Sequence, residues 1–175
     1  SARDQVYNIL YKIIHEIHGD FSHKLIESTS TFLEATFCKL YDDFYLKVDP
    51  NLNLKEMALT NHIVLVPNHQ SHADYIAVTY LIYKQFKTAI HVAGGINLNI
   101  FPVGIFFRKA GAFFMRRSFH NDELYKLTFQ GYLFYLLKNK KIIEFFFEGG
   151  RSRTGKLLPP KYGLFSMLLE AHASL

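Results

Sequence analysis

The sequence predicts one α/β domain with a mostly parallel or mixed sheet flanked by helices, preceded by a small N-terminal helical segment. Short β-branched apolar runs alternate with longer stretches of helical spacing after about residue 50, which is typical of strand–helix–strand units. The first 50 residues show helical spacing only. The chain is 49% hydrophobic with 17 Phe and 11 Tyr, enough to bury a core and to exclude disorder. We therefore expect a helical segment over residues 1–50 and an α/β core over residues 51–175.

The helical segment is expected to hold three helices. Apolar residues at helical spacing predict the first, which Gly19 should end; they are Val6, Ile9, Leu10, Ile13, Ile14 and Ile17. A second helix is expected from about Phe21. A third is expected over residues 31–41, because Thr31 and Glu34 have the spacing of a capping box.

Four apolar runs predict the buried strands of the core. They cover residues 63–66, 89–93, 112–115 and 142–147, and Gly94-Gly95 should end the second. Helices are expected between and after them, over residues 72–86, 98–109 with an interruption near Pro102, 122–138 with Asn121 as N-cap, and 162–171. Asp49-Pro50-Asn51 separates this core from the helical segment.

The charge is distributed unevenly. The net charge is +5, but residues 1–60 carry six Lys and Arg against nine Asp and Glu, whereas residues 61–175 carry fourteen against six. The basic part indicates an anionic partner. We do not expect nucleic acid, because no recognition motif for it is present and the Phe runs read as core strands. The single Cys38 is typical of a reducing compartment, and the longest apolar run, residues 100–107, is too short to span a bilayer.

Polar clusters follow three of the predicted strands. The first covers residues 68–74, the second is Arg116-Arg117-Ser118, and the third covers residues 148–156. The carboxyl ends of parallel strands share one edge of a sheet, which is where ligands bind in such folds. The sequence therefore predicts one cleft that gathers a histidine, an aspartate and five cations.

His69 and Asp74 are candidates for a general base and the carboxylate that orients it. The aspartate would accept from one ring nitrogen and leave the proton-accepting lone pair on the other. Ser71 and Asp74 also have capping-box spacing, so Asp74 alternatively closes a helix N-terminus; both roles can coexist. A metal site at His69, His72 and Asp74 is not favoured, because the sequence offers no evident fourth ligand.

The third cluster matches a phosphate-binding loop only in part. Residues 150–156 have the G-x-x-x-x-G-K spacing, but Leu157 stands where Ser or Thr should bind Mg²⁺, and Pro159-Pro160 prevents an immediate helix. A nucleotide site is therefore not expected. Arg151 and Arg153 can still bind a phosphate, or else the stretch is a solvated basic loop. Of Arg116 and Arg117, one should face the cleft and the other should face away.

Taken together and in order, these stretches resemble the glycerol-3-phosphate acyltransferase family of the large bacterial type. Asn68–Asp74 is similar to its first block, His-x-x-x-x-Asp; Gly111–Phe119 and Phe147–Lys156 resemble the second and third, and Ala93–Asn99 resembles the sequence ahead of the second. The resemblance covers about residues 60–175. Dihydroxyacetone-phosphate acyltransferase, the sister group, shares the Gly-Ala-Phe-Phe-Met-Arg-Arg pattern.

The resemblance implies acyl transfer from acyl-CoA or acyl-carrier protein to the 1-hydroxyl of glycerol 3-phosphate, with no cofactor and no metal. His69 would be the base and Asp74 its orienting carboxylate. Residues implied to bind the phosphate or shape the acceptor site are Arg116, Arg117, Glu148, Gly149, Arg151, Ser152 and Arg153. The resemblance also implies a membrane-associated protein on the cytoplasmic face.

Two alternatives stay open. The acceptor could be dihydroxyacetone phosphate, or the chain could be a non-catalytic membrane- or lipid-binding module that uses the helix at residues 6–17 as an interfacial anchor. Packing of that helix on the core is the simpler interpretation. No fourth block of the family follows residue 156, so we expect the chain to be a piece of a longer protein whose missing part completes the core.

Overall fold

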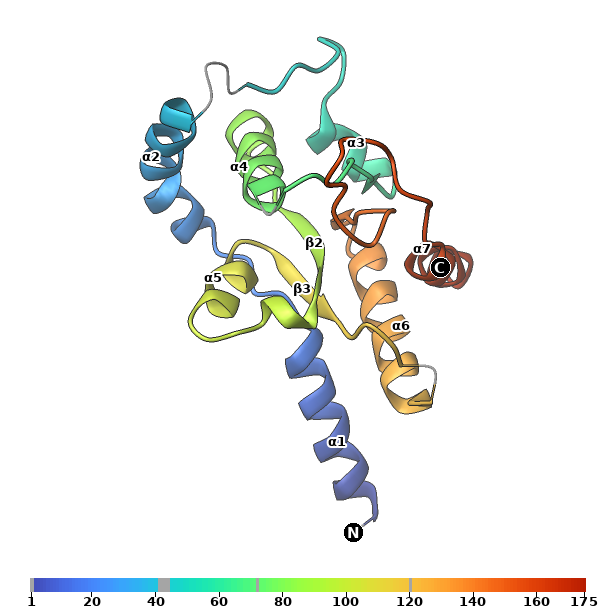
Figure 1. Ribbon diagram of the computed structural model, residues 1–175. Helices are drawn as coiled ribbons and strands as arrows, with labels where there is room; N and C mark the ends of the chain where they lie inside the picture. Colours follow the sequence, from blue (N-terminus) through green and yellow to red (C-terminus); the bar gives the residue numbers. More distant parts are fainter. Residues whose placement is uncertain (1, 41–44, 72, 120) are drawn as a thin grey trace.

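A computed structural model describes residues 2–40, 45–71, 73–119 and 121–175. Its centre is a parallel sheet of four strands in the order β1-β4-β2-β3 (Figure 1). The strands are β1 (Val64–Leu65), β2 (Ile90–Gly95), β3 (Ala112–Met115) and β4 (Ile142–Glu144). The predicted α/β class is therefore confirmed.

The register of the sheet brings all strand ends to one edge. Leu65 of β1 pairs with Glu144 of β4, Val92 of β2 pairs with Glu144 on the other side, and Gly95 of β2 pairs with Met115 of β3. Because every pair is parallel, the segments that follow the four strands leave from the same edge. This edge carries the three polar clusters.

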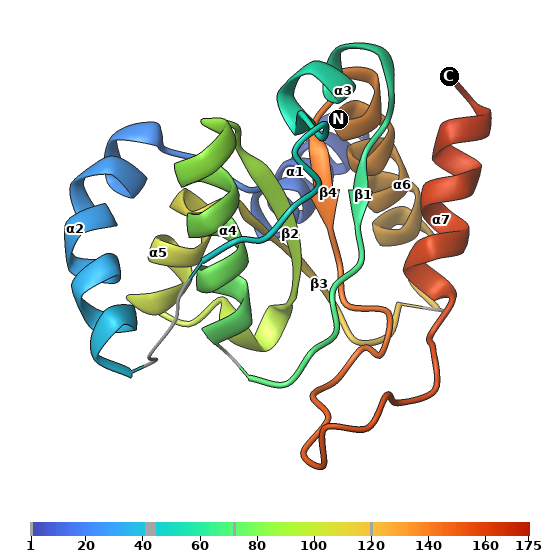
Figure 2. The same ribbon diagram turned by 90° about the horizontal axis from the view of Figure 1, so that it is seen from above.

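Helices cover both faces of the sheet (Figure 2). They are α1 (Ala2–Ile17), α2 (His23–Leu40), α3 (Leu54–Thr60), α4 (Ala73–Phe86), α5 (Val103–Lys109), α6 (Glu123–Lys138) and α7 (Gly163–Ala173), with a 3₁₀ turn η1 (Ile96–Leu98). Side chains of β4 alternate between the two faces. Ile143 packs with α1, α6 and α7, whereas Ile142 packs with α3 and α4.

The first helix is partly integrated into the core. Its N-terminal half extends away from the body (Figure 1), and Val6 and Tyr7 are exposed there. Its C-terminal half buries Ile13 and Ile17 in the cluster that holds Phe113 of β3 and Phe129 of α6. The domain boundary at residue 50 stays a prediction, but this half of α1 belongs to the core of the α/β part.

The predicted third helix in the first segment is wrong. Helix α2 runs without interruption from His23 through Thr31 to Leu40, and the predicted end at Tyr41 lies outside the described residues. The carboxylate of Glu34 does not act at a helix N-terminus. It accepts hydrogen bonds from Lys84 Nζ at 2.5 Å and from the Tyr80 hydroxyl at 3.3 Å, which attach α2 to α4. Tertiary contacts therefore override the capping signal.

Three predicted boundaries also differ from the structure. Strand β2 continues through Gly94 and Gly95, because both pair with β3. Strand β4 ends at Glu144, before residue 147, since β2 pairs only with β3 beyond Val92. The N-cap of α6 is Asp122 in place of Asn121, and its Oδ1 accepts from the Tyr125 amide at 2.9 Å.

Helix α3 was not predicted, and Asn53 caps it by accepting a hydrogen bond from the Glu56 amide at 3.3 Å. None of the helices in the described part of the chain is long and apolar enough to cross a bilayer.

Candidate active site

The site is built around His69, which lies between the end of β1 and the start of α4. Its Nδ1 is 3.2 Å from Oδ2 of Asp74, and the histidine is only 4% exposed. The carboxylate favours the tautomer that carries the ring proton on Nδ1, because that nitrogen then donates to Oδ2. The lone pair that can accept a proton is then on Nε2. The pair has the base–orienter arrangement that the sequence predicted.

Asp74 also organises the turn that leads into α4. Its Oδ2 accepts from the backbone amides of Gln70 at 2.7 Å and Ser71 at 2.8 Å, and its Oδ1 accepts from the Ser71 hydroxyl at 3.0 Å. Burial raises the pKa of Asp74, but the hydrogen bonds from Ser71, Gln70 and His69 outweigh it and lower the pKa overall. Asp74 therefore stays ionised, and its two proposed roles, at the turn and at the histidine, coexist.

Aromatic rings enclose the imidazole. The ring centroid of Phe146 is 4.0 Å from that of His69, and Tyr75 approaches it edge-on at 5.1 Å. Burial and the nearby Glu144 and Asp74 raise the pKa of Tyr75 to about 12, so its hydroxyl stays neutral. These rings exclude water from one side of His69 and hold its orientation.

The loop after β4 is bonded directly to the histidine segment. Glu148 is buried, and its carboxylate accepts from the His69 amide at 3.1 Å and from the Leu158 amide at 2.9 Å. These two bonds, the Leu158 bond first, lower the pKa of Glu148. The Ser152 amide donates to the His69 carbonyl at 2.8 Å, and the Ser152 hydroxyl donates to the Lys156 carbonyl. Glu148 and Ser152 thus position the first and third clusters against each other.

Gly149 allows the tight turn that starts this loop. Its φ is +59°, in the left-handed region that favours glycine. A Cβ at this position would lie 2.8 Å from Cδ of Lys161. The backbone conformation therefore favours glycine here, and a larger residue would in addition displace the flexible Lys161 side chain.

Three of the predicted cations are exposed at this edge. Arg117, Arg151 and Arg153 have exposed side chains and form no ion pair with the described part of the chain. The positive charge of Arg151 opposes the upward shift of the Tyr75 pKa, which places Arg151 in electrostatic reach of the ring that contacts His69. These guanidinium groups are available for an anionic ligand.

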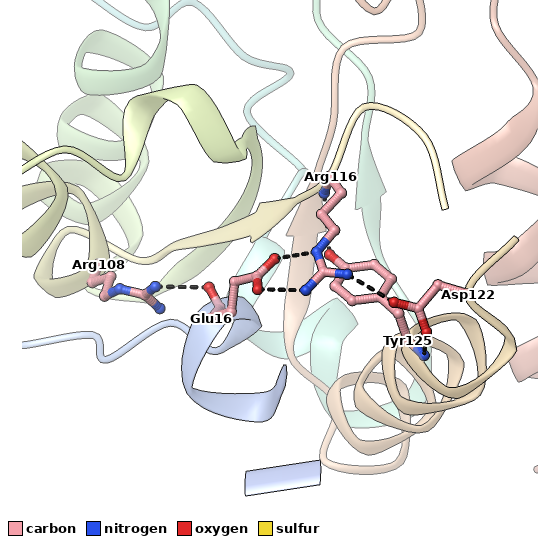
Figure 3. Close-up of polar contacts among 5 residues, drawn as sticks. All are labelled: Glu16, Arg108, Arg116, Asp122 and Tyr125. Atoms are coloured by element: carbon pink, nitrogen blue, oxygen red, sulfur yellow. Dashed lines mark hydrogen bonds and ion pairs between the residues drawn. The ribbon is translucent and has the colours of Figure 1, made fainter. Parts of the chain in front are cut away.

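Arg116 differs from these three (Figure 3). Its Nε and Nη2 donate to the two carboxylate oxygens of Glu16 in α1 at 2.6 and 2.8 Å, and its Nη1 donates to Oδ2 of Asp122 at 2.9 Å. The guanidinium also lies over the Tyr125 ring, 4.2 Å from its centroid. Its substrate-binding role stays a prediction, but in this structure the guanidinium is already bound by two carboxylates.

Glu144 is a feature that the sequence reasoning missed. This β4 residue is fully buried, and neither carboxylate oxygen has a hydrogen-bond partner among the described residues. Burial, followed by the negative charge of Asp74, raises its pKa to about 8. It shares a sheet face with Phe146, one strand repeat away from the ring that contacts His69. A lone acid inside an apolar strand was the signal for it in the sequence.

The described residues hold no group of three or more His, Cys, Asp or Glu side chains that could bind a metal ion. His72, a member of the disfavoured metal alternative, lies outside the described residues.

Comparison with known proteins gives a family and several relatives. Residues 49–175 match the model of the family described as Acyltransferase. The chain is 44% identical over 162 residues to a glycerol-3-phosphate acyltransferase of Haemophilus influenzae (strain PittEE), a match that covers 92% of this chain and 20% of that protein. It is 46% identical over 157 residues to the protein of the same name from Aeromonas hydrophila subsp. hydrophila. That match covers 89% of this chain and 19% of the Aeromonas protein. The chain therefore spans about a fifth of the length of the curated relatives it matches.

Proposed function

The chain belongs to the acyltransferase family, as its match over residues 49–175 shows, and we propose that it transfers a fatty acyl group from a thioester to the 1-hydroxyl of glycerol 3-phosphate. The observation that carries the proposal is the contact of Nδ1 of the buried His69 with Oδ2 of the partly buried Asp74 at 3.2 Å, at the carboxyl edge of the sheet. The names of the similar proteins support glycerol 3-phosphate as the acceptor. The reaction would be the first step of phospholipid synthesis.

In the proposed mechanism, Nε2 of His69 accepts the proton of the acceptor hydroxyl as its oxygen attacks the thioester carbonyl. Asp74 stabilises the imidazolium that forms, because its carboxylate is ionised and bonded to Nδ1. The tetrahedral intermediate then collapses, the C–S bond breaks, and the leaving thiolate takes the proton from Nε2. No acyl group is attached to the protein at any stage.

The phosphate of the acceptor is assigned to the exposed arginines at the same edge. Arg117, Arg151 and Arg153 carry guanidinium groups suited to bidentate contacts with phosphate oxygens. Glu148 and Gly149 shape the loop that holds Arg151 and Arg153. They would therefore affect acceptor binding by setting the position of this loop. The donor would be acyl-CoA or acyl-carrier protein.

We also propose that the protein works on the cytoplasmic face of a membrane. An exposed apolar stretch follows β2 at the site edge of the sheet, and Phe101 within it is 81% exposed; its other exposed members are Ile100, Val103 and Ile105. Apolar side chains beside cations are suited to an anionic lipid surface. Such a surface would also receive the lipid product.

Replacement of the base tests the chemistry. His69→Ala in the full natural length of the protein should lower kcat by at least about a hundredfold, the range of general-base catalysis. Affinity for glycerol 3-phosphate, measured by calorimetry, and the thermal unfolding midpoint should stay near the values of the unsubstituted protein. Unchanged turnover would exclude His69 as the base.

Dihydroxyacetone phosphate is the competing acceptor, because its phosphate fits the same arginines. Assays with both acceptors at equal concentration separate the two, and we expect the larger kcat/KM for glycerol 3-phosphate. A non-catalytic lipid-binding module is not favoured, since such a module has no use for a buried histidine bonded to an ionised aspartate.

A further inference from the structure

The residue immediately before Arg117 is held by two helices (Figure 3). The guanidinium of Arg116 binds Glu16 of α1 through two hydrogen bonds and Asp122, the N-cap of α6, through one. Its backbone amide donates to the Tyr125 hydroxyl at 3.1 Å. These hydrogen bonds raise the pKa of Arg116, the Glu16 bond most of all, so the group stays charged. The chain is therefore held here through both side chain and backbone.

The partner Glu16 is itself fixed in place. Its carbonyl accepts from Arg108 Nη2 at 2.7 Å, and a second nitrogen of Arg108 donates to the His18 carbonyl. The Gly19 amide donates to the Tyr132 hydroxyl at 3.0 Å. The C-terminal end of α1 is thus anchored to α5 and α6, and its carboxylate has a defined position relative to the end of β3.

We infer that Glu16 and Arg116 form a positioning pair that sets the affinity for the acceptor phosphate through Arg117. The inference rests on the proposed function, in which Arg117 binds that phosphate. Glu16 lies outside residues 49–175, the part that matches the acyltransferase family. The N-terminal helix is then a part of the acceptor site, although it supplies no group that touches the substrate.

The physical basis is the geometry of the bidentate contact. Two parallel hydrogen bonds fix the plane of the Arg116 guanidinium, and the adjacent Tyr125 ring limits it from one side. When the Glu16 carboxylate is lost, the guanidinium loses its bidentate contact and keeps the hydrogen bond to Asp122, while the Arg116 amide keeps its hydrogen bond to the Tyr125 hydroxyl. The chain at the end of β3 is then held by fewer contacts. Arg117 then spends less time in the orientation that meets the phosphate, which weakens acceptor binding and leaves the chemistry at His69 unaltered.

The test compares Glu16→Gln with a matched control, Asp20→Asn. Asp20 follows the same helix and forms a 2.9 Å ion pair with Lys109, but it has no contact with Arg116. In the full natural length of the protein, Glu16→Gln should raise KM for glycerol 3-phosphate by about tenfold with kcat within about twofold and KM for the thioester unchanged. Asp20→Asn should leave all three constants within about twofold.

The charge-swapped variant, Glu16→Arg with Arg116→Glu, is combined with Asp122→Asn so that the new carboxylate does not face Asp122. It should recover part of the acceptor KM relative to Arg116→Glu with Asp122→Asn, because it restores one ion pair between the same elements. Equal increases of both KM values, or a change in the unfolding midpoint with no change in acceptor KM, would show that the pair only stabilises the fold and would overturn the inference. If the unsubstituted protein transfers no acyl group to glycerol 3-phosphate, the proposed function fails and the inference fails with it.

Discussion

Glu144 should make the protein less stable as the pH rises through neutrality. Its carboxyl is fully buried without a hydrogen-bond partner among the described residues, and its pKa is raised from 4.5 to about 8. A raised pKa means that the folded state binds the proton more tightly than the unfolded state. The contribution of Glu144 to the free energy of unfolding is therefore fully present below about pH 4.5. It is lost as the pH rises from about 4.5 to 8.

The size of the effect follows from the shift. At about 1.36 kcal/mol per pKa unit, a shift of about 3.5 units corresponds to a loss of about 5 kcal/mol above pH 8, and of about 3 kcal/mol at pH 7. Such a loss is a large fraction of the stability of a domain, commonly about 5–15 kcal/mol. Glu144→Gln removes the ionisation and keeps the size of the side chain. Its amide is also buried without partners, but that cost does not depend on pH.

The assay is urea unfolding of both proteins at pH 5, 7 and 9. The free energy of unfolding of Glu144→Gln, relative to the unsubstituted protein, should increase by several kcal/mol from pH 5 to pH 9. Glu170→Gln, which alters an exposed carboxylate on α7, serves as the control and should show a nearly constant difference. If the two variants have the same pH dependence, Glu144 ionises as freely in the folded state as in the unfolded state, and the reasoning from burial is wrong.

Three further predictions concern other parts of the molecule. Arg151→Ala or Arg153→Ala should raise KM for the acceptor about tenfold and KM for the thioester little, measured by steady-state kinetics; equal effects would contradict phosphate binding. Burial lowers the pKa of His91 from 6.5 to about 4, so the folded protein should lose about 3 kcal/mol of stability as the pH falls from 6.5 to 4. His91→Asn should remove this loss, as measured by urea unfolding. If the loss at acid pH persists in the variant, it belongs to other groups. Phe101→Ser should weaken sedimentation with anionic vesicles several-fold, whereas Leu59→Ser, an exposed residue of α3 ahead of β1, should not; equal binding by both variants would place the lipid contact elsewhere.

Local spacing in the sequence predicted most of the fold and the His69–Asp74 pair of the site. Apart from α3, which the sequence did not predict, the strands and helices after residue 50 follow from apolar periodicity, and the structure changes mainly their ends. His69 and Asp74 are five residues apart at the entrance of a helix, so their contact follows from the local turn. Glu34 shows where such reasoning fails: its capping-box spacing was correct as a pattern, but Lys84 and Tyr80 of α4 bind its carboxylate.

The contacts of Arg116 and Glu144 depend on residues distant in sequence. Arg116 binds Glu16, 100 positions earlier, and no pattern in the chain connects them. Glu144 is central in the sheet, paired by β1 and β2, and its side chain lies on the face where its neighbours Ile142 and Phe146 pack with α3 and α4. This covering of the carboxyl exists only once the helices are packed on the sheet. The residue type gives the charge of a side chain. The free energy of holding that charge in the folded protein depends on which groups the fold brings within a few ångströms.

The amino-acid sequence was enough to predict the α/β class, a sheet edge with polar clusters, and the residue types of the proposed acyl-transfer site. Periodicity and short spacings are local properties of the chain. They determine which residues form helices and strands, because each element must bury its apolar face. The tertiary structure separated the arginines by their surroundings: Arg116 is bound by Glu16 and Asp122, whereas Arg117, Arg151 and Arg153 are exposed at the site edge. That difference arises from packing between distant elements, because two neighbouring arginines of identical chemistry differ only in what surrounds them.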